Sequence, residues 1–143
     1  MSRNRSFHPV PRGGIDPIRS ADDALAVLAL GAPYEHDTIL ILLDEQRRGS
    51  SILIVSDTHG PDAMFRILDT FLAATRGDAC AAGLILATSR PDGEVEFGDI
   101  HRWLEASDQC AAGGLELVEW FVLGRTGPRC PRALFGERER WAA

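Results

Sequence analysis

The chain contains 143 residues, of which 45% are hydrophobic and 25% are charged, a balance typical of one ordinary globular domain. All 15 basic residues are arginine, which excludes a P-loop lysine, a Schiff-base lysine and a Ser/Lys hydrolase. The formal net charge of -6 argues against broad attachment to nucleic acid or to an anionic membrane, because such attachment requires a basic face.

Targeting and cysteine patterns add little to this description. No apolar run approaches the roughly 20 residues that span a bilayer, and the N-terminus lacks the apolar core of a signal peptide. We therefore expect a cytoplasmic protein. The three cysteines, Cys80, Cys110 and Cys130, are widely spaced and include no CxxC pair, so they predict neither a disulfide framework nor a zinc cluster.

The N-terminal segment combines four arginines with several prolines and glycines. This composition predicts a flexible tail over residues 1–19, followed by a single domain over residues 20–143. Ser20, with an acidic residue three places on, has the form of a helix N-cap, and leucines at helical spacing follow it. Gly31 and Pro33 are expected to end that helix.

Two aliphatic runs come next, at residues 38–43 and 51–55, with a short polar turn between them. Adjacent strands joined by so short a turn form an antiparallel hairpin. An amphipathic helix is expected to begin near Pro61 and to end at Gly77, with its apolar face against the sheet.

The second half of the chain predicts a strand, a helix and a further strand. Residues 83–88 form a buried strand, which the preceding helical crossover makes a candidate parallel partner of an earlier strand. Asp99 is placed to act as the N-cap of a helix over residues 100–112. A last strand is expected over residues 115–123.

Beyond a turn-rich segment, Phe135 and Trp141 are the aromatic residues that we expect to dock on the body of the domain. The element order α-β-β-α-β-α-β indicates the α/β class, with three αβα layers and a mixed central sheet.

Four segments at matching intervals resemble those of one known family. Residues 20–24 (SADDA) are similar to its S-P-E-D-V helix start, and residues 42–44 (LLD) to its first-strand L-L-D. Residues 81–87 (AAGLILA) are similar to A-A-A-V-I-L-A, and residues 117–124 (LVEWFVLG) to L-L-D-H-V-I-V-G. From about residue 18 to 140 the chain thus resembles the JAB/MPN domain of bacterial RadC-like proteins, in the JAMM metalloprotease-like superfamily. The resemblance implies a cytidine-deaminase-like fold.

In that family an H-x-H-P motif and a later S-x-x-D bind zinc, and an upstream glutamate handles the proton of the metal-bound water. Here the H-x-H-P positions are occupied by Thr88, Ser89, Arg90 and Pro91, so both histidines are replaced. Arginine stays protonated and cannot ligate zinc. We therefore expect no zinc and no other cofactor, and the resemblance implies a domain that has lost metal hydrolysis and acts as a binding or scaffolding module.

The other positions of the implied site are partly retained. Glu96 stands at the serine position and Asp99 at the aspartate position, while His36 occupies the register of the upstream glutamate, with Glu35 one residue away. One hypothesis is that Arg90, the hydroxyls of Thr88 and Ser89, and the helix N-terminus near residue 100 accept an anion. The simpler alternative is that Arg90 pairs with Asp99 or Glu96 and fills the space of the metal.

A second local pattern points to different chemistry. Residues 52–60 (ILIVSDTHG) are similar to the first motif of calcineurin-like metallophosphoesterases, in which D-x-H binds one of two metals. The later histidine motifs of that family are missing. The enzyme alternative is therefore a metal-dependent peptidase or phosphoesterase with a nonstandard site at Asp57, His59 and Asp99, whereas the simpler interpretation of Asp57 and His59 is a polar turn that caps the next helix.

Candidate partners follow from these patterns. A protein or a small anionic ligand fits a binding module, and exposed edge strands would permit self-association into a homo-oligomer. The family's association with DNA repair suggests a nucleic-acid accessory role, which the negative charge opposes.

Overall fold

The computed structural model describes residues 5–9, 16–30 and 35–141, and all the structural statements that follow concern these residues. The elements in chain order are β1 (Arg5–Pro9), α1 (Ala21–Leu30), β2 (Thr38–Leu43), β3 (Gly49–Val55), α2 (Ala63–Thr75), β4 (Gly83–Ser89), α3 (Gly98–Ala112), β5 (Glu116–Gly124), β6 (Gly127–Arg129) and α4 (Pro131–Phe135).

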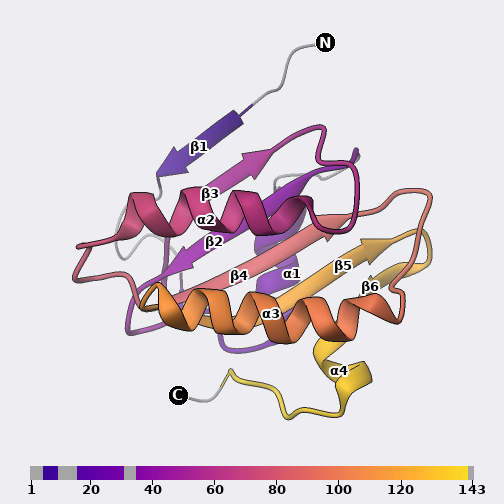
Figure 1. Cartoon of the computed structure of the whole chain (residues 1–143). Helices are drawn as coiled ribbons and strands as arrows, with labels where there is room; N and C mark the ends of the chain where they lie inside the picture. The colour runs from indigo at the N-terminus through magenta and orange to yellow at the C-terminus, as the bar shows by residue number, and fades with distance from the viewer. Residues whose placement is uncertain (1–4, 10–15, 31–34, 142–143) are drawn as a thin grey trace.

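One mixed sheet contains six strands in the order β1-β3-β2-β4-β5-β6 (Figure 1). β2 and β3 form the predicted antiparallel hairpin, and β4 and β5 are the parallel pair. The remaining neighbours, β1 with β3, β2 with β4 and β5 with β6, are antiparallel. The prediction of a mixed central sheet is therefore confirmed.

The predicted partner of β4 is wrong. We expected β4 to pair in parallel with an earlier strand, but it pairs antiparallel with β2 and parallel with the later strand β5. The crossover through α2 does keep β3 and β4 in the same direction, since each is antiparallel to β2. Because β2 lies between β3 and β4, these two strands do not exchange hydrogen bonds.

Helices cover both faces of the sheet and define three layers. α2 and α3 lie on one face, in front of the sheet in Figure 1, and α1 lies behind it. Successive side chains of β4 point to opposite faces of the sheet. Leu84 and Leu86 pack with α2 and α3, whereas Ile85 and Ala87 pack with α1. The α/β architecture with three layers agrees with the predicted class.

The predicted tail boundary needs correction. Arg5–Pro9, expected to be flexible, forms the edge strand β1 against β3, and Ile18 is buried in the core on the α1 side. The outer edge of β3 offers unpaired backbone groups to an extended segment, and a proline is tolerated in an edge strand. The expected stop at Gly31 and Pro33 lies outside the described residues, as does the remainder of the tail at residues 1–4 and 10–15.

The C-terminal segment docks as predicted at one aromatic residue and not at the other. Trp141 is buried, with its ring 6.4 Å from that of Phe121 in the α1-side core. Phe135 is 49% exposed, which contradicts the prediction. The short helix α4 turns Pro131 and Arg132 inward, so that its last residue faces solvent.

Within the described residues, no helix combines the length and the hydropathy that crossing a bilayer requires.

Candidate functional site

The predicted site residues gather at one edge of the sheet, where β3, β4 and β5 end and β2 begins. Thr88 and Ser89 are the last residues of β4, and Asp57 follows the end of β3. The amide of Ser89 donates a hydrogen bond of 2.8 Å to the carbonyl of Asp37, the residue after His36. This bond joins the edge positions of β4 to those that precede β2.

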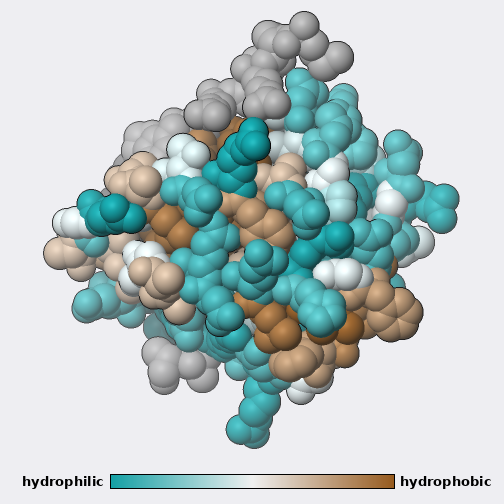
Figure 2. Space-filling view, viewed as in Figure 1, coloured by the Kyte–Doolittle hydropathy of each residue, from teal (hydrophilic) through white to brown (hydrophobic). Residues whose placement is uncertain are grey.

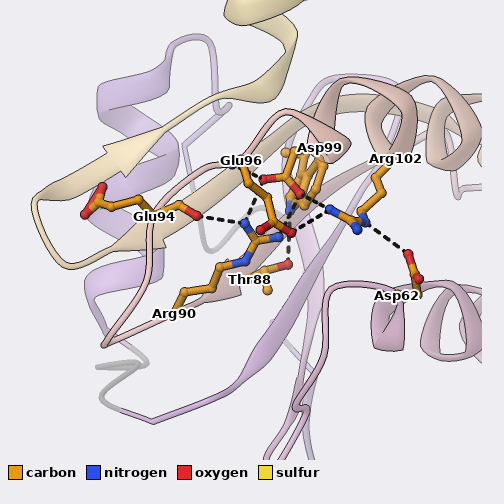
Figure 3. Close-up of polar contacts among 8 residues, drawn as sticks. Asp62, Thr88, Arg90, Glu94, Glu96, Asp99 and Arg102 are labelled. Atoms are coloured by element: carbon orange, nitrogen blue, oxygen red, sulfur yellow. Dashed lines mark hydrogen bonds and ion pairs between the residues drawn. The ribbon is translucent and has the colours of Figure 1, made fainter.

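Asp99 is the centre of the site, and its side chain is fully buried. Arg90 donates from Nη1 to Oδ2 at 2.7 Å and from Nη2 to Oδ1 at 2.8 Å, a bidentate ion pair (Figure 3). Arg102 Nη1 and the amide of Glu96 donate two further bonds, at 2.9 and 2.8 Å. The predicted N-cap role is wrong, because α3 begins at Gly98 and Asp99 lies inside its first turn.

Two arginines keep the buried carboxylate of Asp99 in its charged form. Burial alone would raise the pKa of Asp99, but the hydrogen bonds from Arg90, the Glu96 amide and Arg102 lower it below its ordinary value. Asp99 is therefore ionised at neutral pH.

The donors of Arg90 point inward. Beyond its two bonds to Asp99, Nη1 also donates to the carbonyl of Glu94 at 3.0 Å, and the guanidinium lies 6.0 Å from the ring of Trp120. Of the two predicted partners, Arg90 pairs with Asp99, and Glu96 pairs with Arg102 instead. An anion at Arg90 would have to displace a carboxylate that already occupies it, so this geometry disfavours an anion pocket.

Arg102 extends the ion pair toward α2. Its Nη1 contacts Glu96 and Asp99, and its Nε donates 3.0 Å to Asp62, the exposed residue before α2. Figure 3 shows the resulting series of alternating charges, which passes from Arg90 through Asp99 and Arg102 to Asp62.

The turn after β4 is held against the end of β5. A Cβ at Gly124 would lie 2.8 Å from the carbonyl oxygen of Gly93, so only glycine permits this approach. The amide of Arg125 donates to the same carbonyl, and the amide of Thr126 donates to the Glu94 carboxylate. These contacts fix the Glu94 carbonyl that Arg90 uses.

The hydroxyl of Thr88 is also part of the interior. Its oxygen accepts a hydrogen bond of 3.0 Å from the indole nitrogen of Trp120, and both residues are buried. Ser89, on the opposite side of the strand from Thr88 by alternation, is only 3% exposed. Neither hydroxyl stands open beside the guanidinium of Arg90.

A second cluster lies where the segment before β2 meets the segment after β3. The rings of His36 and His59 lie 4.4 Å apart, and Thr58 donates from both its amide and its hydroxyl to the carbonyl of His36. Asp57 adopts a left-handed backbone with φ of 60°, and Glu35 is exposed. The fold therefore brings together the four secondary candidates of the sequence in a polar turn. The prediction that Asp57 or His59 caps the next helix is wrong, because the N-cap of α2 is Asp62 and no side chain caps that helix.

Asp37 is the unusual group of this cluster. It is buried, and its Oδ1 atom has no hydrogen-bond partner among the described residues. Burial raises its pKa above the ordinary value, and a hydrogen bond from Ser56 offsets this only in part.

The donors do not fit a metal ion. In the part of the chain that the structure describes, no three histidine, cysteine, aspartate or glutamate side chains gather closely enough to hold one. Asp57, His59 and Asp99 therefore do not form a common ligand set. Both oxygens of Asp99 already face guanidinium groups, whose charge would repel a divalent cation.

Sequence reasoning missed three residues of the site. Arg102 could have been found, because it stands three residues after Asp99 on one helix and such residues are neighbours. The contact of Trp120 with the site depends on the parallel register of β4 and β5, and the unusual state of Asp37 depends on its burial. Neither of these features has a local sequence signal.

No protein-family model matches the chain, and no curated protein sequence matches it. The resemblance to RadC-like JAB/MPN domains therefore stays a prediction.

Proposed function

We propose that this chain is a RadC/JAB-like domain without metal hydrolysis, which acts as a binding or scaffolding module. One observation carries the proposal, namely the bidentate pair between Arg90 and Asp99. By the resemblance, these two residues stand at a histidine and at the aspartate of the family's zinc site. The guanidinium then supplies the positive charge that a metal would otherwise bring to Asp99.

Strand geometry supports this assignment. Thr88 and Arg90 are two residues apart at the end of β4, so both project toward the face that α3 covers. Asp99 meets Arg90 from the first turn of α3. A buried carboxylate needs a partner of opposite charge, and arginine meets that need with no open coordination position for substrate or water.

The enzyme alternative has no comparable support. A peptidase or phosphoesterase based on Asp57, His59 and Asp99 requires these groups to share a metal, and the fold does not bring them together. The anion-accepting role of Arg90 is likewise weakened, since Asp99 and the Glu94 carbonyl take three of its five N–H donors.

The test is metal content before and after the two histidines are restored. Purified protein, dialysed against zinc and then buffer, should retain no stoichiometric zinc by elemental analysis. The double variant Thr88→His/Arg90→His should retain one zinc per chain, because two imidazoles and Asp99 then form a three-ligand site. Adding Asp99→Ala to that variant is the matched control and should abolish retention.

Tryptophan fluorescence and circular dichroism would verify that each variant is folded. Stoichiometric zinc in the unmodified protein, together with cleavage of a peptide or isopeptide substrate, would overturn the proposal. Failure of a folded double variant to retain zinc would show that residues 88 and 90 do not stand at the family's histidine positions.

A further inference from the structure

A groove of about 850 Å³ lies between α2 and β3, on the face of the sheet shared with α3. Its floor is formed by Leu42, Leu53 and Val55, and its wall by the side of α2 that includes Ile67 and Phe71. Figure 2 views this side of the molecule, on which tan and brown side chains are interrupted by teal ones. The volume lies within the range of binding sites for small or extended ligands.

The groove is as long as α2 and carries acidic residues at both ends. Asp57 and Asp62 stand where α2 begins, and Asp78 stands just beyond its end. At 1.5 Å per helical residue these ends are about 20 Å apart. Asp62 is already paired with Arg102, whereas Asp57 and Asp78 form no ion pair among the described residues, so each end of the groove offers one aspartate to a cation; Arg66 is the one described arginine in the lining.

Hydroxyl groups line the groove between the acidic ends. They belong to Ser50, Ser51, Ser56, Thr58, Thr70 and Thr75. Ser50, Thr58, Thr70 and Thr75 donate their hydroxyl protons to backbone carbonyls of the chain itself, so they can serve a ligand only as acceptors for its backbone amides. Leu53 and Val55 face the groove at the period of two that matches alternate side chains of such a chain.

We propose that this groove binds an extended peptide segment of a partner protein, with apolar residues in its middle and arginine or lysine at its ends. At about 3.3 Å per residue, the length of the groove accommodates about six to seven residues. The proposal rests on the proposed binding role and names the site and the ligand of that role. Charge complementarity with the acidic ends selects a basic occupant over an acidic one.

The experiment titrates the ¹⁵N-labelled full chain with two synthetic heptapeptides, capped at both termini and followed by NMR. One has leucine at alternate positions, serine between them and arginine at both ends; the other replaces the arginines by glutamate. The arginine peptide should shift amide signals of the groove residues, whereas the glutamate peptide should not. Equal affinity for both peptides, shifts confined to residues outside the groove, or no binding of the arginine peptide would overturn the proposal.

Variants locate the contact. Asp57→Asn/Asp78→Asn should weaken binding by up to about tenfold, because it removes two charge pairs with the peptide, one at a half-buried and one at an exposed aspartate. Ala74→Phe, which fills the groove from the exposed side of α2, should abolish binding. Asp108→Asn on α3 removes an exposed aspartate away from the groove, and it should leave the affinity unchanged.

Zinc retention separates this proposal from the previous one. A chain that retains no zinc but ignores the arginine peptide would overturn the groove proposal alone. A chain that binds the peptide and retains stoichiometric zinc with hydrolytic activity would overturn the loss of catalysis alone.

Discussion

Nη1 and Nη2 of Arg90 each donate a hydrogen bond to a different carboxylate oxygen of Asp99, at 2.7 and 2.8 Å. The pair joins the end of β4 to the first turn of α3, and the Asp99 side chain is inaccessible to solvent. A buried anion of this kind depends on its cation, because removal of one partner leaves an uncompensated charge.

Arg90→Ala should therefore destabilise the fold by about 3 kcal/mol, the lower end of the range for breaking a buried ion pair, since Arg102 remains. Urea unfolding at pH 7, followed by tryptophan fluorescence, measures this change. Arg125→Ala is the matched control, because Arg125 is exposed in the turn after β5 and should change stability by less than about 0.5 kcal/mol. Equal stability of the two variants would show that Asp99 does not depend on Arg90.

Asp99→Asn should reduce stability at neutral pH and leave it nearly unchanged in acid. The pKa of Asp99 is lower in the folded than in the unfolded chain, so its ionised form stabilises the fold above the ordinary value of about 3.9. This contribution is lost as the pH falls through the lowered folded pKa. Urea unfolding of both proteins from pH 7 to pH 2 should show converging stabilities, and a constant difference would contradict the prediction.

Asp37→Asn should increase the stability of the fold at neutral pH, which is opposite to the effect of Asp99→Asn. Burial raises the pKa of Asp37, so ionisation opposes folding once the pH exceeds the unfolded value of about 3.9. Asparagine removes that charge and keeps an oxygen that can accept the bond from Ser56. The variant should be more stable than the unmodified chain at pH 7, and its advantage should disappear below about pH 4. Thermal unfolding at both pH values tests this, and a destabilised variant at pH 7 would refute it.

Arg140→Ala should lower the free energy of unfolding by about 1–2 kcal/mol, because it removes several contacts of the C-terminal segment at once. The guanidinium lies 4.5 Å from the centre of the Trp103 ring and donates to the Ser107 hydroxyl and the Leu117 carbonyl. Arg138→Ala, two residues away at an exposed position, is the control and should be nearly neutral. Chemical denaturation of the two variants gives the comparison, and similar midpoints would argue against anchoring by Arg140.

Continuous aliphatic runs made most of the sheet predictable. The predicted bounds 38–43 match β2, and those for β3, β4 and β5 are correct to within two residues at each end. β1 has no such run, since its pairing depends on the free edge of β3 rather than on local composition. The pairing of β4 was also missed, because the order of strands across a sheet is a tertiary property.

The sequence predicted where the site lies better than it predicted which side chains contact one another there. The strand, turn and helix that carry Arg90 and Asp99 are evident in the sequence, and their pairing was one of two alternatives. Asp99 was expected to cap a helix because an aspartate after a loop commonly does so. Two arginines determine its actual role, and one of them stands nine residues earlier in the chain.

The series Arg90, Asp99, Arg102 and Asp62 also has a mechanical consequence. It fastens the end of β4, the first turn of α3 and the loop before α2 to one another through side chains alone. Separation of β4 from α3 would break the pair between Arg90 and the buried Asp99, whereas separation of the loop before α2 would break only the pair between Arg102 and the exposed Asp62. The end of β4 and the first turn of α3 should therefore open as one cooperative unit, and the loop before α2 should open more readily.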